Sequence, residues 1–430
     1  MESSVKGKKV NIANFGKGWG IILYCLAMFW FYVGMCNDGT NATAPAVAEK
    51  LAVDVGVIYN MNAIGGLIGI IIFIVAGQVN RRIGARITSG VFCIIAGCAY
   101  MVLGNAPSVE IYALAYSFTI GGIMSAGYIA GGTLVATWFP KTKGVVMGYT
   151  TMGHNLASAF YVPIMMFLMS LKPSGVSFGV VPIGVGCIIL GIIGIIFVRN
   201  TPSERGQNPD NVTDEVYKTE YDTSSEENDD GWTTKSLLKC KELWIASIAT
   251  GCFQICSTGI MSTLVLRNLE IGFSIEIAMT IMSICAFVGI VGSWSIGILD
   301  DKFGTKRTML GFGVWYASAL LCNATQVMPM IYLSIFMIGM GIGGSANFTT
   351  SLPTSIFGRQ GFDKVNSVIF PIQGAITALC FAINGIVSQL TGGSYRWSYV
   401  IFAGIAILAS ILVTTIDDKK YNRDFKAENA

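Results

Sequence analysis

The chain has 430 residues, of which 53% are hydrophobic and only 12% are charged, and its formal net charge is +3. That charged share is about half of what soluble globular domains carry, which excludes a soluble fold of this size, and the small net charge argues against nucleic acid as a partner. The eleven cysteines lie mostly inside apolar runs and the single histidine is His154, so we expect no metal site and no cofactor.

Twelve apolar stretches are long enough to cross a bilayer, which takes about 20 residues as a helix. In chain order they cover residues 19–41, 56–79, 86–104, 109–137, 144–169, 176–198, 242–266, 274–298, 308–325, 329–353, 364–389 and 396–416. The first stretch is too long for a cleaved signal and follows a basic, polar segment. The sequence therefore predicts an all-α membrane protein.

The longest polar segment separates the sixth stretch from the seventh. It is rich in Asp, Glu, Asn, Ser and Thr and holds almost no apolar residues, so we expect a flexible linker. The chain is thereby divided into an N-terminal six-helix bundle (1–198), the linker (199–241), a C-terminal six-helix bundle (242–416) and a tail (417–430).

The placement of Lys and Arg predicts the orientation in the membrane. With a cytoplasmic N-terminus, 24 of the 28 Lys and Arg residues fall on the cytoplasmic side, and the other four are Lys50, Lys172, Arg267 and Arg396. Positive charge is retained on that side, so we expect a multi-pass protein of the cell membrane with both termini cytoplasmic. The same distribution places no Lys or Arg near the middle of the membrane.

Two loops at matching places of the two halves have similar sequences. After the second stretch the chain reads Gly77-Gln-Val-Asn80-Arg81-Arg82-Ile-Gly84, and after the eighth Gly297-Ile-Leu-Asp300-Asp301-Lys302-Phe-Gly304-Thr-Lys306. The second loop resembles the G-x-L-x-D-[RK]-x-G-x-[RK] signature of the major facilitator superfamily, whose two halves form a parallel internal repeat. The resemblance implies twelve transmembrane helices arranged as two pseudo-symmetric six-helix bundles.

The same signature implies a gate at the cytoplasmic ends of the two halves. Asp301 stands at a helix end, where a carboxylate can pair with basic residues or cap a neighbouring helix. In the first loop the expected Asp is replaced by Asn80, which keeps the hydrogen bonds and loses the charge. The gate residues implied by the resemblance are Gly77, Asn80, Arg81, Gly84, Gly297, Asp301, Lys302, Gly304 and Lys306.

A further loop, Trp138-Phe139-Pro140-Lys141-Thr142-Lys143-Gly144, resembles the W-F-P-x-x-[RK]-G loop of the oxalate–formate antiporter and monocarboxylate-like branch. Members of that branch mostly move small organic anions, and Tyr128 matches a Tyr that precedes their loop. The antiporter's Arg and Lys, which bind the dicarboxylate, are replaced here by Ser293 and Gly374, with Gln373 adjacent. The resemblance implies a small organic acid other than oxalate.

His154 lies ten residues into the fifth stretch, about 15 Å deep at 1.5 Å per residue. Burying such a group without a partner is costly, which makes it a functional candidate. An imidazole with a pKa near ~6.5 could bind an anion when protonated and release it when neutral. The alternative is a neutral His that bonds to a neighbouring helix.

Other polar residues lie within the apolar stretches. Asp38, near the outer end of the first, is either a helix-end residue or a cation or proton site that would favour a substrate with an amine. Two glutamines and an asparagine lie deeper and either bind substrate or bond one helix to another. The candidate substrate-binding residues are His154, Tyr128, Gln373, Gln254, Asn347 and Asp38.

These patterns together predict a secondary active transporter, a symporter or antiporter, that moves a small organic acid such as a monocarboxylate by alternating access. The alternatives are the same fold carrying a zwitterionic, amine or neutral solute, and a non-transporting membrane sensor. An enzyme is not expected, because a membrane-embedded active site would need clustered His, Glu or Asp. The expected partners are a small-molecule solute, H+ and the lipid bilayer, with no nucleic acid, and the chain is expected to act as a monomer.

Overall fold

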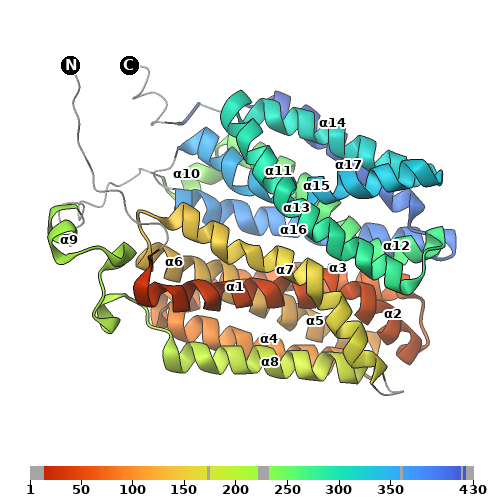
Figure 1. Cartoon of the computed structure of the whole chain (residues 1–430), viewed down its shortest axis with the longest axis horizontal. Helices are drawn as coiled ribbons and strands as arrows, with labels where there is room; N and C mark the ends of the chain where they lie inside the picture. The colour runs from red at the N-terminus through yellow and green to blue at the C-terminus, as the bar shows by residue number, and fades with distance from the viewer. Residues whose placement is uncertain (1–13, 172–174, 221–231, 359–361, 418–419, 423–430) are drawn as a thin grey trace.

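The computed structural model of the chain describes residues 14–171, 175–220, 232–358, 362–417 and 420–422. Within these ranges nearly all regular structure is helical, and long helices lie side by side in two groups (Figure 1). The first group, the N-half, holds the elements α1 to α8, and the second, the C-half, holds α11 to α17. The predicted fold class, twelve long membrane helices in two six-helix bundles, is confirmed.

The N-half contains two helices that include π-helical segments. Its elements are α1 (Trp19–Val33), η2 (Gly34–Asp38), α2 (Thr40–Leu51), α3 (Val55–Ile83), α4 (Ala85–Asn105), α5 (Val109–Met124), η3 (Ser125–Gly131), α6 (Gly132–Trp138), α7 (Lys143–Ser170) and α8 (Val176–Phe197). The segments η2 and η3 are π-helical, a wider geometry that is frequent at functional sites.

The C-half repeats this arrangement with one interrupted helix. Its elements are α11 (Lys241–Met261), α12 (Leu264–Ile271), α13 (Ile275–Phe303), α14 (Thr305–Ala324), α15 (Met328–Phe357), α16 (Phe362–Thr391) and α17 (Arg396–Thr414). Among the described residues, eleven helical spans are long and apolar enough to cross a membrane. The twelfth long helix, α14, is less apolar because its twenty residues include Lys306, Arg307 and Asn323.

The two loops with similar sequences end their helices in the same way. Gly84 closes α3 with φ +81°, and Gly304 closes α13 with φ +82°. Each glycine donates its backbone N–H to the carbonyl oxygen four residues earlier, on Asn80 and Asp300. A side chain is strained at such positive φ values, which explains glycine at both places.

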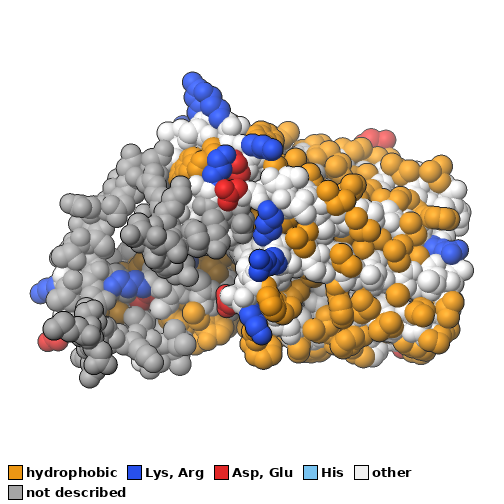
Figure 2. Space-filling view, turned by 90° about the horizontal axis from the view of Figure 1, so that it is seen from above, with side chains coloured by type: hydrophobic (Ala, Val, Ile, Leu, Met, Phe, Trp, Pro, Cys, Tyr) orange, Lys and Arg blue, Asp and Glu red, His pale blue; other side chains and the backbone are white. Residues whose placement is uncertain are grey.

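The outer surface of the bundle is apolar, as a membrane requires. Exposed hydrophobic side chains include Ile71 at 62% exposure and Phe167 at 63%. Figure 2 shows hydrophobic side chains spread over one flank, with most of its Lys and Arg side chains toward the end that carries the termini in Figure 1. We call that end, where α9 (Asp214–Glu220) and α10 (Thr234–Leu238) also lie, the linker end, and the opposite end the distal end.

The described parts of the linker pack on the bundles, although the sequence predicted a flexible segment throughout. The buried Asp210 accepts hydrogen bonds from the backbone N–H groups of Lys141 and Thr142, at 3.0 and 3.1 Å, just before α7 begins. On the C-half, the Trp232 ring packs edge-on against Phe357 and Tyr421, with centroids 5.4 and 5.5 Å away. Each bundle thus holds its own part of the linker.

Candidate functional site

Five rings from four helices meet where the two halves face each other. Phe29 of α1 packs edge-on against His154 of α7, with ring centroids 4.8 Å apart, and against Tyr128 of η3 at 5.0 Å. Tyr32 lies 5.4 Å from Tyr128, which also lies 5.8 Å from Phe370 of α16. We call these five residues the central cluster. Two of the predicted site residues, His154 and Tyr128, therefore lie together, with ring centroids 6.3 Å apart.

The imidazole of His154 has a free hydrogen-bonding position. Its Nε2 atom is buried and has no hydrogen-bond partner among the described residues. The surrounding groups are rings, so the predicted alternative of a bond to a neighbouring helix is not satisfied at this atom. An unpartnered buried polar atom costs about 1–3 kcal/mol, which a ligand's own polar group would offset.

Gln373 supplies a second unpartnered atom from the other half. It follows Phe370 by three residues on α16, so the two side chains share a face of that helix. Gln373 is buried at 8% exposure, and its Oε1 atom lacks a partner in the described part of the chain. Polar groups without partners therefore stand on both halves, near the rings that join them.

Asp38 is buried and is the last residue of η2, and the chain continues through Gly39 into α2. Its carboxylate accepts a hydrogen bond from the Ser158 hydroxyl of α7. Ser158 lies one helical turn beyond His154, on the same face of α7. Its burial and its bond to Ser158 favour the site alternative for Asp38 over a mere helix-end residue, and the carboxyl lies beside the central cluster along the α1–α7 contact.

The remaining candidates bond within the C-half. Asn347 of α15 accepts a hydrogen bond from the Ser293 hydroxyl of α13 at 2.8 Å, and its amide donates to the Ser293 carbonyl, also at 2.8 Å. Gln254 of α11 donates to the Ser345 carbonyl of α15 at 3.3 Å. Both contacts join helices of one bundle, which favours the packing alternative for these two residues.

The fully buried Arg267 of α12 lies near the distal end of the C-half, outside the central cluster. Its guanidinium donates to the side-chain and backbone oxygens of Asn323, at 3.0 and 3.1 Å, and forms an ion pair with Glu270 at 2.8 Å. Arg267 also lies over the Tyr399 ring, 5.7 Å from its centroid. With its charge already paired, Arg267 is a structural residue.

The gate loops lie at the linker end. The structure changes which residue of the first loop corresponds to which residue of the second. Asn80 occupies the place of Asp300, because each stands four residues before the glycine that ends its helix. The expected match of Asn80 to the signature Asp is therefore wrong, and Arg81 stands opposite Asp301. Asn80 donates to the Thr133 hydroxyl of α6 at 3.0 Å, a contact within the N-half.

Half of the other predicted gate residues are exposed in this conformation, and the rest are half-buried. Asp301, Lys302 and Gly304 are exposed, whereas Lys306 is half-buried and donates to the Ile416 carbonyl at 2.6 Å. Of the remaining gate residues, Gly77 and Arg81 lie near the end of α3, Gly84 follows its last residue, and Gly297 lies near the end of α13. A gate role for this set remains a prediction.

The contacts between the halves are concentrated toward the distal end. A Cβ atom added to Gly56 of α3 would lie 2.5 Å from the Gly385 carbonyl oxygen of α16, so the two backbones touch there. Further along, Ser283 of α13 donates to the Ala159 carbonyl of α7 at 2.6 Å. The central cluster is thus closed off from the distal end.

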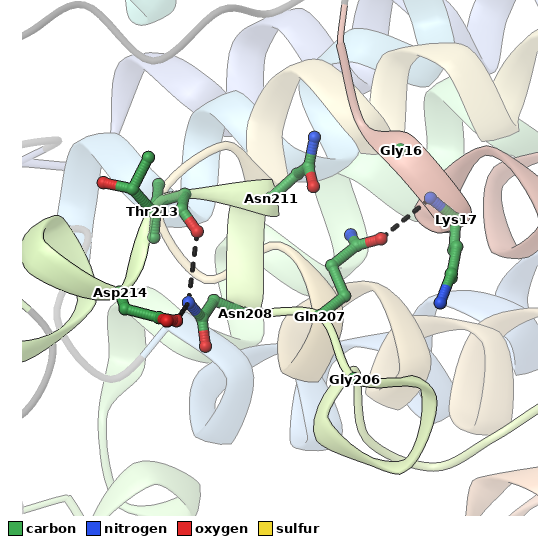
Figure 3. A pocket seen from close by; sticks show the side chains of 9 residues that line it. Gly16, Lys17, Gly206, Gln207, Asn208, Asn211, Thr213 and Asp214 are labelled. Atoms are coloured by element: carbon green, nitrogen blue, oxygen red, sulfur yellow. Dashed lines mark hydrogen bonds between the residues drawn. The ribbon is translucent and has the colours of Figure 1, made fainter.

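A hollow of about 540 Å³ at the linker end lies apart from the central cluster. Figure 3 shows its lining between the start of the first helix and the linker, where the Lys17 N–H donates to Gln207 at 2.8 Å. On its other side Asn208 donates to Asp214 at 2.7 Å. Its polar groups mostly bond to one another, so we interpret it as part of the linker's docking surface.

Sequence reasoning missed several residues of the site. Phe29, Tyr32 and Phe370 are apolar or aromatic positions in apolar helices, and periodicity does not separate an inward ring from a lipid-facing one. Ser158 is equally inconspicuous, since serines are common in membrane helices. The available signal was spacing, because Ser158 is four residues from His154 and Phe370 is three from Gln373.

Comparisons with known proteins agree with this architecture. A family model described as Major Facilitator Superfamily matches residues 22–310 and 246–430. The chain is 25% identical over 275 residues to the oxalate:formate antiporter of Oxalobacter formigenes, covering 62% of this chain and 59% of that protein. It is 22% identical over 304 residues to the uncharacterized MFS-type transporter YhjX of Escherichia coli, covering 69% and 70% of the two chains.

Solved structures share the fold at low sequence identity. A D-xylose-proton symporter is similar with a TM-score of 0.69 and 11% identity, over 94% of this chain and 98% of that one. The nucleoside transporter NupG is similar with a TM-score of 0.67 and 12% identity, over 92% and 99% of the two chains. These likenesses concern the fold alone.

Proposed function

The chain belongs to the Major Facilitator Superfamily and is a multi-pass membrane transporter, and we propose that it moves a small monocarboxylate by alternating access. In this proposal the carboxylate binds at the central cluster, between the His154 imidazole and the Tyr128 hydroxyl. The observation that carries the proposal is the buried Nε2 atom of His154, which has no partner among the described residues.

A carboxylate matches the chemistry that is free in the central cluster. Carboxylate oxygens only accept hydrogen bonds, and both a protonated imidazole and a phenol can donate them. A hydrogen bond between charged groups contributes about 1.5–3 kcal/mol, which corresponds to roughly ten-fold to hundred-fold in affinity. The 25% identity to the oxalate:formate antiporter supports an organic acid as substrate.

The same residues make H+ a natural co-substrate. An isolated charge in a water-poor site is costly, whereas an anion beside a protonated imidazole leaves no net charge there. Since no Lys or Arg belongs to the central cluster, the compensating proton would have to sit on His154. We therefore propose that one proton enters with each anion, as in a symporter. In an antiporter, the proton would instead leave the site as one anion is exchanged for another.

The aromatic walls of the cluster favour a substrate with a small apolar part. Phe29 and Phe370 offer ring surfaces to an acyl chain, and the unpartnered Gln373 Oε1 is an acceptor for one further polar group. A dicarboxylate would bring a second charge without a cationic partner, which is unfavourable in a buried site. The proposal is thus limited to monoanions.

A second candidate substrate class rests on Asp38. A buried carboxyl whose identified side-chain partner is the neutral Ser158 hydroxyl would suit an amine or a zwitterion. In that case Asp38 would bind the substrate and His154 would not contribute to the affinity. The two classes predict opposite outcomes for substitutions at His154 and Asp38.

We further propose that the protein lies in the cell membrane with both termini in the cytoplasm, so that the linker end is the cytoplasmic end. This orientation rests on the 24 of 28 Lys and Arg residues that it places on that side. Labelling of single cysteines introduced into the N-terminal segment and the tail, with a membrane-impermeant reagent on intact cells, tests it. Labelling of either terminus from outside would contradict the orientation.

The transport proposal is tested by uptake into proteoliposomes. Labelled monocarboxylates, amino acids and betaines are offered with and without an inward pH gradient. We expect monocarboxylate uptake that the gradient stimulates and that is lost in His154→Ala. Thr151→Ala is the matched control, because its hydroxyl bonds to carbonyls of its own helix one turn before His154. Uptake of betaines or amino acids without uptake of monocarboxylates would contradict the proposal.

A further inference from the structure

The interrupted helix of the C-half is completed by side chains of the N-half. Helix α11 ends at Met261 and α12 begins at Leu264, with Ser262 and Thr263 between them. An interruption of this kind leaves carbonyl groups at one helix end and N–H groups at the next without helical partners. Neither Gly nor Pro occurs at the break, so the local sequence does not explain it.

Asn41 of α2 serves both sides of the break at once. Its amide nitrogen donates to the Met261 carbonyl at 2.7 Å, and its amide oxygen accepts from the Val265 N–H at 2.9 Å. Asn is a preferred residue for capping the second N–H of a helix, and here the cap comes from the other bundle. The Thr263 side chain, at the ordinary capping position, makes no cap hydrogen bond to α12.

Two more N-half hydroxyls reach the same segment. Tyr59 of α3 donates to the Ser262 carbonyl at 2.8 Å, and Thr40 of α2 approaches that oxygen at 3.2 Å. Asn41, Tyr59 and Thr40 are all buried at 4% exposure or less. The contacts are therefore shielded from water. Removing one partner leaves the other buried and unsatisfied, which costs folding free energy.

We propose that Asn41, Tyr59 and Thr40 form a latch that holds the distal end closed by completing the α11–α12 break. When the halves are together, the latch satisfies the backbone of the break. When they separate at the distal end, water takes over the same backbone groups, so opening exposes them without leaving them unpaired. The strength of the latch thus sets the balance between the closed and open distal end.

The latch is also joined to the backbone of Asp38, the residue that carries the buried carboxyl of the N-half. The amide nitrogen of Asn41 donates a further hydrogen bond to the Asp38 carbonyl at 2.9 Å, within the turn that follows η2. Asn41 therefore uses three hydrogen-bonding groups, one on its own half and two on the other. This arrangement fixes the orientation of the amide, because the oxygen must face the Val265 N–H.

The role of the latch in transport rests on the proposed alternating access. Its effect on the closure of the distal end does not, and that effect can be tested without substrate. Hydrogen–deuterium exchange of the purified full chain in lipid nanodiscs measures opening of the distal end. In Asn41→Ala we expect exchange to rise roughly ten-fold to hundred-fold, together, in α2, α12 and the distal end of α16. Exchange in α4 and α8, which pack on each other away from the latch, should stay as in the wild type.

Two further variants test the proposal: one should produce a smaller rise in exchange, and the other is a control that should produce none. Tyr59→Phe removes one hydroxyl and keeps the ring against Phe381 and Tyr395, so we expect a smaller rise in the same three segments. Asn60→Ala is the control. It removes another amide contact between the halves, the 3.2 Å hydrogen bond from Asn60 to Gln389, and this bond is exposed to solvent. It should leave exchange unchanged.

Wild-type exchange in α12 and α16 in Asn41→Ala, or an equal rise in every helix, would overturn the latch. If Asn41→Ala does not fold, Tyr59→Phe decides by the same criteria. A protein that fails to transport monocarboxylates yet shows the graded rise would contradict the proposed function and retain the latch.

Discussion

The central cluster and the latch are both buried, polar and shared by the two halves, yet they treat their polar atoms differently. In the latch, Asn41 has partners on both sides of the α11–α12 break. His154 Nε2 in the central cluster and Gln373 Oε1 on α16 beside it are buried without partners among the described residues. Buried polar groups are normally paired, and these two unpaired atoms lie near the rings that join the halves, where a ligand would contact both.

This difference separates residues that stabilise the fold from residues that bind substrate. Removing a paired group should lower the free energy of unfolding, because its former partners are left unsatisfied. Removing an unpaired group should leave that free energy nearly unchanged or raise it, and should weaken binding instead. Stability and affinity, measured on the same variants, therefore test whether the two regions differ in this way.

The largest effect on stability is expected at Arg267. Arg267→Ala takes the guanidinium away from the buried Asn323 oxygens and removes the cation that pairs with the Glu270 carboxylate, which keeps its hydrogen bonds from Ser394 and Tyr395. Removing one member of a buried charged network costs about 3–5 kcal/mol, so we expect a strongly lowered melting temperature in detergent. A variant as stable as the wild type would show that the network contributes little.

A moderate effect is expected where Ser293 and Asn347 bond reciprocally. Asn347→Ala and Ser293→Ala should each cost about 1–2 kcal/mol of unfolding free energy, and the double variant should cost less than their sum. Thermal unfolding of the four proteins of this cycle measures the coupling. Strict additivity would mean that the pair does not stabilise the C-half.

Gln373→Leu should affect binding and not folding. The substitution removes a buried amide oxygen that has no partner among the described residues and keeps a similar volume, so the melting temperature should stay or rise. Loss of one neutral hydrogen bond to substrate costs about 0.5–1.5 kcal/mol, or roughly two-fold to twelve-fold in affinity. A lowered melting temperature with unchanged affinity would reverse the assignment.

The smallest effect on stability is expected at Asp301, which is exposed in the distal-closed conformation. Asp301→Asn should express and melt like the wild type, because exposed ion pairs contribute about 0–1 kcal/mol. If Asp301 joins the halves when the linker end closes, uptake should nevertheless slow. Unchanged uptake rates in proteoliposomes would count against the gate.

The sequence predicted the long helices well because apolar runs of membrane length have few alternative structures. It failed at the first and seventh helices for a physical reason. The chain stays helical to Leu51 through Pro45, and it breaks at Ser262 without Gly or Pro, because partners from the other half stabilise both features. Contacts of that kind are not encoded in local periodicity.

The candidate site was predicted in part. The criterion of polar residues in apolar helices identified His154, and the family resemblance identified Tyr128; the structure places the two together. The same criterion selected Asn347, whose partner Ser293 lies on another helix and could not be paired with it from one sequence. Which polar atom is left without a partner depends on tertiary packing, so the sequence yields candidates and the structure separates them.

Carboxylate binding at His154 is tested by the pH dependence of monocarboxylate binding in His154→Ala and Asp38→Asn, measured side by side with the wild type. We expect His154→Ala to weaken binding roughly ten-fold to hundred-fold and to flatten its pH dependence between about 5 and 8, where an imidazole titrates. His154→Lys should keep binding at high pH, because its charge is fixed, and Asp38→Asn should change affinity little. Wild-type pH dependence in His154→Ala, with binding lost in Asp38→Asn, would contradict the account.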